Sequence, residues 1–129
     1  MPRKDWTIRL EDMLDAAEKI VRYTEEIPDL DAFISNDLIV DGVIRNVQII
    51  GEAARHIPDD AQARYPDVDW IGMRGMRNIL VHDYAAVRLD LVWGVVEARI
   101  PPLVRRLREI VELEVGSELD GPGARDDAF

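Results

Sequence analysis

The sequence predicts an all-α protein: an antiparallel up-and-down helical bundle of four main helices, the last of them kinked. Apolar residues recur every three or four positions over long segments, and no segment alternates apolar and polar residues as a half-buried strand does. The connections between these segments are short, which favours antiparallel neighbours. A chain of 129 residues suffices for one domain. We expect residues 1–115 to form that domain and residues 116–129, rich in glycine and acidic residues, to be a disordered acidic tail.

The first helix is predicted from Lys4 to Ile27, and Pro28 ends its helical pattern. Charged residues occupy one face of this helix. The opposite face is apolar and is expected to enter the core; it consists of Leu10, Met13, Leu14, Ala17, Ile20 and Val21.

The second helix is predicted to begin at Asp31 or Ser35 and to end at Ile57. Glycine costs a helix up to ~1 kcal/mol, so Gly42 and Gly51 indicate points where another helix approaches closely. The apolar stripe of this helix consists of Val40, Val43, Val47, Ile50, Ala54 and Ile57. A narrower polar stripe, either a solvated surface or the lining of a cleft, consists of Arg45, Gln48, Glu52 and Arg55.

The third helix follows a connection, residues 58–69, that has room for one short helical turn. Asp67 or Asp69 is the expected N-cap, because an aspartate side chain can accept a hydrogen bond from the first turn. The buried face is expected to consist of Trp70, Met73, Met76, Ile79 and Leu80.

The last helix is predicted to begin near Leu89, capped by Asp90 or by a residue before it. Its apolar residues keep one helical phase across Pro101 and Pro102. Two prolines remove backbone donors and clash with the preceding turn, so we expect a kink there.

Composition and charge exclude several classes of protein. The net charge of −10, from 16 basic and 26 acidic residues, argues against a broad basic face for nucleic acid, so such a role needs a local basic site. The absence of cysteine excludes disulfides and thiolate metal sites. No run approaches the ~18 apolar residues of a membrane helix, and the first residues lack an apolar signal core. We expect a cytoplasmic protein with no membrane span, no metal and no cofactor.

The segment RGMRNILVHDYA, residues 74–85, concentrates the reactive side chains of the chain. On a helix Arg74, Asn78 and His82 share one stripe, whereas Arg77 and His82 lie five residues apart, about 140° around the axis. These two residues can converge if the helix ends near His82, or if a symmetry mate brings in a second copy. His82 can exchange a proton near neutral pH, and the Arg77 guanidinium suits a phosphate.

The residues alone leave two interpretations of this cluster open. In one, His82 moves the proton of an RNA 2′-hydroxyl, Arg77 stabilises the charged phosphorane, and Tyr84 supplies a further hydroxyl without any metal. In the other, the cluster caps a helix and fills a polar pocket. The second histidine, His56, follows the last turn of the second helix, where it is expected to be a cap and not a catalyst.

The stretch RNILVHDY resembles the R-x(4–6)-H-x-Y motif of the HepT-like proteins of the HEPN superfamily. The segments NVQIIGEAARHIP and YPDVDWIGM around it are similar to that family too, and the similarity covers roughly Ile8 to Leu107. The resemblance implies a HEPN-like bundle that forms a homodimer, in which two motifs meet in a cleft. It implies a metal-independent endoribonuclease toxin of a type VII-like toxin–antitoxin pair, with RNA as substrate. The implied partner is a nucleotidyltransferase antitoxin of the MntA type, which transfers AMP to the motif tyrosine.

Carried over by position, Arg77 and His82 are the implied catalytic residues, and Asn78 supports their geometry. Tyr84 is the implied AMP acceptor.

Outside the motif, we expect Arg74 and Arg45 to contact substrate phosphates, with Arg55 as a further candidate. If the polar stripe of the second helix faces the cleft, Glu52 is expected to hold an arginine in place. One alternative function is a non-catalytic HEPN module that binds a nucleotide or a partner protein, and the acidic surface favours it. Another is a purely structural bundle.

Overall fold

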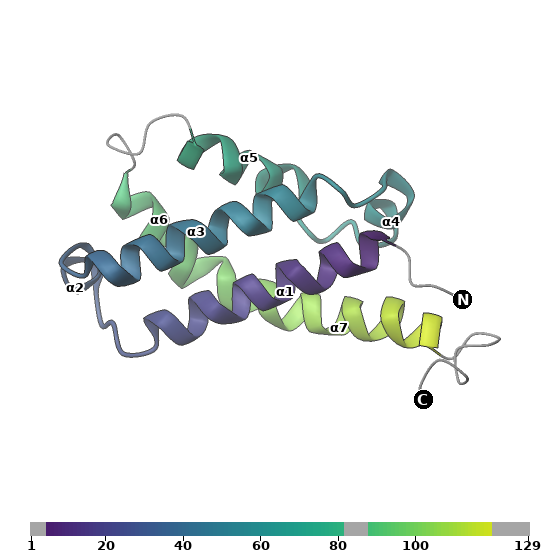
Figure 1. Cartoon of the computed structure of the whole chain (residues 1–129), viewed down its shortest axis with the longest axis horizontal. Coiled ribbons are helices and arrows are strands. Elements are labelled where there is room, and N and C mark those ends of the chain that lie inside the picture. The colour runs from purple at the N-terminus through teal and green to yellow at the C-terminus, as the bar shows by residue number, and fades with distance from the viewer. Residues whose placement is uncertain (1–4, 82–87, 120–129) are drawn as a thin grey trace.

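The computed structural model describes residues 5–81 and 88–119, and within these ranges every regular element is a helix (Figure 1). The predicted all-α fold class is confirmed. The helices are α1 (Asp5–Thr24), α2 (Leu30–Ile34), α3 (Asp37–Ala54), α4 (Asp59–Arg64), α5 (Trp70–Val81), α6 (Leu89–Ala98) and α7 (Ile100–Leu119).

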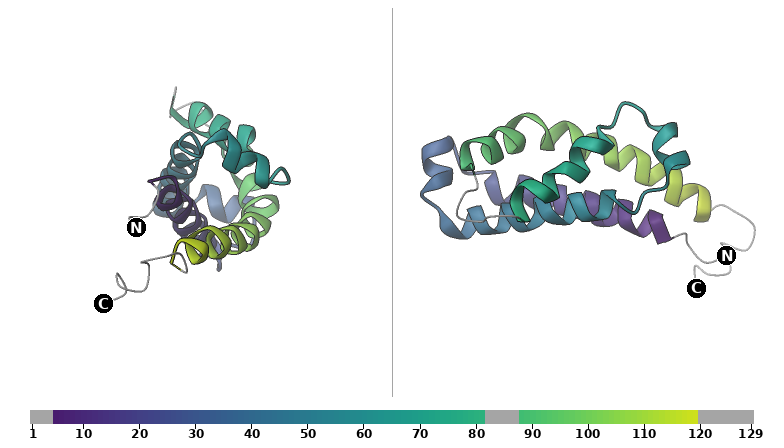
Figure 2. Two further views of the ribbon diagram at one scale, coloured as in Figure 1. Left: turned by 90° about the vertical axis from the view of Figure 1, so that its right-hand side faces the viewer. Right: turned by 90° about the horizontal axis from the view of Figure 1, so that it is seen from above.

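Helix α3 lies between α1 and α5, and α7 packs against the other side of α1 (Figures 1 and 2). Successive long helices run in opposite directions, so α1 begins and α7 ends at the same end of the molecule. The short helices α2 and α4 lie in the connections before and after α3. This antiparallel arrangement agrees with the predicted bundle and sets α1, α3 and α5 side by side.

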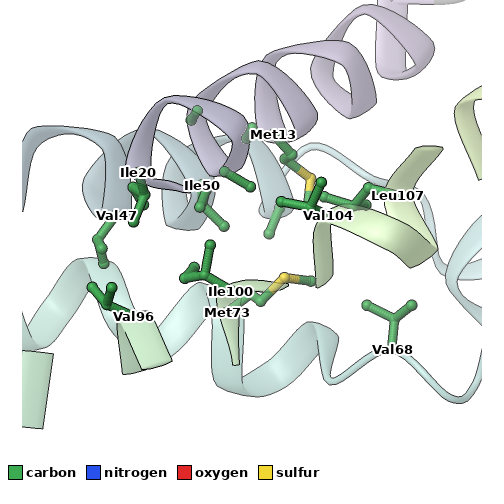
Figure 3. Packing of buried hydrophobic residues seen from close by; sticks show 14 of the residues in the cluster. Met13, Ile20, Val47, Ile50, Val68, Met73, Val96, Ile100, Val104 and Leu107 are labelled. Atoms are coloured by element: carbon green, nitrogen blue, oxygen red, sulfur yellow. The ribbon is translucent and has the colours of Figure 1, made fainter. Parts of the chain in front are cut away.

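The core forms where the apolar faces of these helices meet (Figure 3). The predicted apolar stripe of the second helix is buried from Val40 to Ile57, although α3 itself ends at Ala54 and not at the predicted Ile57. Burying one such aliphatic side chain contributes roughly 1.5–3 kcal/mol, so these faces hold the bundle together. Side chains that meet in the core come from α1, α3, α5, α6 and α7 and include Met13, Ile20, Val47, Ile50, Met73, Val96, Ile100 and Leu107.

The two glycines of α3 mark close helix contacts, as predicted. A Cβ on Gly51 would lie 2.9 Å from both the Cβ and the backbone nitrogen of Arg77, and 3.0 Å from the carbonyl oxygen of Met73. A Cβ on Gly42 would lie 3.1 Å from the ring of Tyr23. The absence of a side chain at residue 51 therefore lets the backbone of α5 approach α3 at Arg77.

The region predicted as the start of the second helix is two helices, so a single helix from Asp31 is wrong. The Asp29 side chain accepts the Ala32 N–H at 2.9 Å and caps α2, and the Asn36 side chain accepts the Ile39 N–H at 3.1 Å and caps α3. Each cap satisfies an otherwise free backbone donor. The expected short helical turn in residues 58–69 is α4.

Of the two aspartates predicted to cap the third helix, Asp69 does so: its Oδ1 accepts the Gly72 N–H at 3.0 Å. Asp67 instead pairs with Arg106 of α7. For the last helix, the N-cap is a residue before Asp90, namely Arg88, which makes no side-chain cap hydrogen bond. The alternative cap, Asp90, is wrong, because Asp90 lies inside the first turn of α6 and pairs with Arg88 at 2.7 Å.

The predicted kink lies at Arg99, between α6 and α7. Pro101 and Pro102 have no N–H to donate to the carbonyls of the preceding turn, which interrupts the helix there. Hydrogen bonds continue on both sides: Arg99 donates to Val95 at 2.9 Å, and Leu103 donates to Arg99 at 3.2 Å.

Helix α7 continues to Leu119, so the first four residues of the predicted tail, 116–119, are helical, and residues 120–129 lie outside the described part of the chain. None of the described helices has the length and hydropathy needed to cross a lipid bilayer.

Candidate functional site

Arg77 of α5 is anchored to α3 by an ion pair. Its Nε lies 2.7 Å from Oε2 of Glu52, and both side chains are partly exposed. Glu52 directly follows Gly51, the residue that lets α5 approach, so one local feature of α3 brings both partners together. An exposed pair contributes little to stability, and its main effect is to fix the guanidinium plane.

Arg77 and Glu52 line a hollow of about 350 Å³ formed by α1, α3 and α5. Three of the four residues of the polar stripe, Arg45, Gln48 and Glu52, therefore line a concave surface, whereas Arg55 does not. The hollow is lined by Arg9, Asp12, Arg45, Gln48, Ile49, Glu52, Ala53 and Arg77.

The lining is locally basic in an acidic protein. It holds three arginines against two acidic residues, whereas the whole chain has a net charge of −10. Within the described ranges neither Arg9 nor Arg45 has a hydrogen-bonded or ion-paired partner. The hollow therefore presents cationic donors to an anion.

Glu52 is shared among three basic side chains. Besides Arg77, its carboxylate lies 3.4 Å from Nη1 of Arg55 and 3.6 Å from Nε2 of His56. Arg55, a sequence candidate for contacting substrate, is outside the lining of the hollow. The side chain of His56 approaches Glu52 on the turn before it, and its backbone N–H donates to the Ala53 carbonyl at 3.0 Å.

The predicted site residues divide into three groups. The structure brings Arg45, Glu52 and Arg77 to one hollow, and it places Arg74 on α5 outside the lining. Asn78 lies in α5, but its side chain is outside the described part, as are His82 and Tyr84 in full.

Arg9 was missed by the sequence analysis. It is one arginine on the polar face of an amphipathic helix, and no local pattern connects it to the motif. Only the packing of α1 on α3 places it beside Arg45.

The described residues contain no group of three or more His, Asp or Glu side chains placed to hold a metal ion. The donors that converge here are guanidinium groups and one amide, which bind phosphate or carboxylate oxygens.

A family model described as Ribonuclease HepT-like matches residues 13–110, most of the chain. The chain belongs to this HepT-like family. The match spans α1 to α7 and so confirms the resemblance drawn from the motif and its flanks.

Relatives agree with this assignment. A protein of Methanocaldococcus jannaschii, whose name assigns it provisionally to the RNases, is 38% identical over 111 residues, covering 86% of this chain and 100% of the relative. A protein of Thermococcus cleftensis named "Probable ribonuclease HepT" is 36% identical over 101 residues, covering 78% of this chain and 91% of the relative. No solved structure matches the chain.

Proposed function

We propose that this HepT-like protein is a metal-independent endoribonuclease that cleaves RNA with Arg77 and His82, as the toxin of a toxin–antitoxin pair. The observation that carries the proposal is the Arg77–Glu52 pair at 2.7 Å, in the lining of a basic hollow in a chain of the Ribonuclease HepT-like family. The ribonuclease names of the relatives support RNA as the substrate class.

The proposed reaction needs a base, a phosphate clamp and a proton for the leaving group. His82 takes the proton of a 2′-hydroxyl, whose oxygen attacks the adjacent phosphorus while the bond to the 5′-oxygen breaks. The 5′-oxygen receives a proton, which leaves a 2′,3′-cyclic phosphate and a 5′-hydroxyl. Arg77 stabilises the charge on the phosphorane, because Glu52 engages its Nε and leaves its terminal nitrogens for phosphate oxygens. Asn78 supports the geometry of the pair.

The homodimer and the antitoxin belong to the same proposal. A second copy would bring two motifs together, which resolves the angular separation of Arg77 and His82 on one helix. A nucleotidyltransferase of the MntA type would then neutralise the toxin by transferring AMP to the Tyr84 hydroxyl.

The test uses the purified chain, a single-stranded RNA and a metal chelator. The wild type is expected to produce cyclic-phosphate ends in the chelator, and His82→Ala is expected to lose about 10²–10⁴-fold in rate. Arg22→Gln is the control, since Arg22 is an exposed arginine of α1 outside the hollow. Cleavage by His82→Ala at the wild-type rate would overturn the assignment.

The second candidate is a HEPN module that binds a nucleotide or a partner protein without cleaving RNA. The net charge of −10 favours it, since an acidic surface repels RNA outside the hollow. RNA that stays intact with the wild type, together with tight binding of a nucleotidyltransferase, would select this alternative.

A further inference from the structure

We propose that Arg9 of α1 and Arg45 of α3 form a phosphate subsite beside Arg77, which holds an RNA phosphodiester next to the one that is cleaved. The inference rests on the proposed function in one respect: Arg77 is taken to engage the scissile phosphate. The subsite itself follows from the charges, packing and chemistry of the hollow.

The hollow carries more basic than acidic side chains. Several arginines elsewhere on the described surface are held by carboxylates, including Arg88 by Asp90 at 2.7 Å and Arg108 by Glu18 at 2.8 Å. Arg9 and Arg45 line a concave surface, and neither has such a partner within the described ranges. Cations gathered in a hollow repel one another, and a bound anion relieves this repulsion.

Two carboxylates, those of Glu52 and Asp12, line the hollow. Glu52 already serves Arg77, Arg55 and His56, so it offers little neutralisation to Arg45. Asp12 is the remaining acidic residue of the lining. With Glu52 engaged by Arg77, the rest of the lining therefore keeps two arginines, Arg9 and Arg45, against the single carboxylate of Asp12.

The lining combines guanidinium groups with an amide and apolar side chains. Gln48 adds a neutral amide to the lining, and the partly buried Ile49 adds apolar surface. Guanidinium forks bind phosphate oxygens in pairs, and apolar surface accepts the sugar or base attached to them. A polymer that carries a phosphate at every residue fits this combination, because Arg77 lines the same hollow and can engage the next phosphate along.

The subsite is predicted to bind substrate and to take no part in bond cleavage. A dinucleotide with one phosphodiester can occupy only the Arg77 position, whereas a longer RNA reaches Arg9 and Arg45 too. The subsite should therefore lower the KM of long substrates and leave dinucleotide cleavage unchanged.

The experiment compares the wild type with the double variant Arg9→Gln/Arg45→Gln on a dinucleotide and on a ten-residue RNA. The matched control is Arg22→Gln/Arg105→Gln, which removes the same charge from two exposed arginines outside the hollow that have no partner within the described ranges. We expect the hollow variant to raise the KM of the long RNA about tenfold or more, with similar kcat and unchanged dinucleotide cleavage. Equal effects of both double variants, or equal losses on both substrates, would overturn the subsite.

A binding measurement separates this inference from the proposed function. Affinity for a 2′-O-methyl oligonucleotide, which cannot be cleaved through its 2′-oxygen, is measured against salt concentration. The slope of log K against log salt is negative, and losing two phosphate contacts of a single strand should reduce its magnitude by about 1.4. If the wild type cleaves no RNA, the proposed function fails, while this slope still decides the subsite.

The charge-retaining variant Arg9→Lys/Arg45→Lys is expected to recover part of the affinity, with a thermal unfolding midpoint close to that of the wild type. An unchanged slope in the glutamine variant, with weakened binding of a nucleotidyltransferase, would assign the hollow to a protein partner and overturn the proposal.

Discussion

The hollow between α1, α3 and α5 contrasts with the polar cluster that joins α4 to α7. In that cluster Glu114 of α7 is only 14% exposed and accepts from Arg64 at 2.9 and 3.3 Å, and from the Tyr65 hydroxyl. Arg106 of α7 lies 5.5 Å from the centre of the Tyr65 ring and also binds Asp67 at 2.8 Å. Every charge in this cluster has a partner, and the partners come from segments far apart in the chain.

Ionisation in the cluster follows from these contacts. Burial, and then the hydrogen bond to Glu114, raises the pKa of Tyr65. The hydrogen bond to Glu114 also raises the pKa of Arg64, and the hydrogen bond from Arg106 lowers the pKa of Asp67. Arginines therefore have different roles in the α4–α7 cluster and in the hollow of this acidic protein. Arg64 and Arg106 bind carboxylates and hold α4 and the residues after it to α7, whereas Arg9 and Arg45 have no carboxylate partner within the described ranges and are available to a ligand.

The largest expected effect is that of Arg77→Ala on activity. Loss of the phosphate clamp should lower kcat/KM about 10²–10³-fold, as removal of one oxyanion donor does. Its exposed ion pair contributes at most about 1 kcal/mol, so the free energy of unfolding should change little. Steady-state cleavage and urea unfolding of the same sample measure both. A large stability loss with intact activity would place Arg77 with the structural arginines.

Glu114→Ala should have the opposite profile. It leaves the half-buried Tyr65 hydroxyl and Arg64 without their acceptor, which costs about 1.5–3 kcal/mol of unfolding free energy. RNA cleavage per folded molecule should stay at the wild-type level, because Glu114 lies outside the hollow. Urea unfolding measures the first quantity, and a loss of specific activity would contradict the separation of the two regions.

Gly51→Ala tests the link between packing and site. The added Cβ would meet the α5 backbone at 2.9–3.0 Å, and overpacking of this kind costs about 1–3 kcal/mol. Displacement of α5 should also move Arg77 and reduce kcat, which kinetics at saturating RNA would report. The control is Gly94→Ala, since a Cβ there would have no atom within 4 Å in the described part of the chain apart from its chain neighbours and the backbone of its own helix. Wild-type stability and activity in Gly51→Ala would refute the close contact.

Glu52→Gln should have a smaller effect on catalysis. The amide keeps a hydrogen-bond acceptor but loses the charge that fixes the Arg77 guanidinium, so we expect kcat to fall about tenfold. Arg55→Ala is the matched control, because it removes another partner of Glu52 without touching the hollow. Equal kcat values for the two variants would remove Glu52 from the positioning of Arg77.

The smallest expected effect is the pH dependence of the Asp67–Arg106 pair. The pKa of Asp67 is lowered in the folded state, so its contribution to stability is present above the unfolded pKa, about 3.8. The contribution is lost as the pH falls through the lower, folded pKa. Wild type should therefore be slightly more stable than Asp67→Asn at pH 6, and the difference should vanish in strong acid. Thermal unfolding across this range measures it, and a difference that grows in acid would refute the pairing.

Helical periodicity predicted much of this fold because the apolar stripe of each amphipathic helix marks the face that is buried. The buried faces of α1, α3 and α7 could be predicted from each helix alone. Gly51 predicted a close contact but not which helix makes it. Caps were harder to predict, since Asp67, Asp69 and Asp90 are chemically equivalent. Arg106 and Arg88 bind two of them, and that choice depends on residues outside the local pattern.

The site divides in the same way. The sequence by itself determined that Arg77 and Asn78 lie in one helix, and that Arg45, Gln48 and Glu52 share one face, because helical spacing is a local property. Only the tertiary structure decided that this face meets Arg77 and that Arg9 joins it. Both depend on the register of α1 and α5 against α3, which the contact at Gly51 and the shape of the core set together.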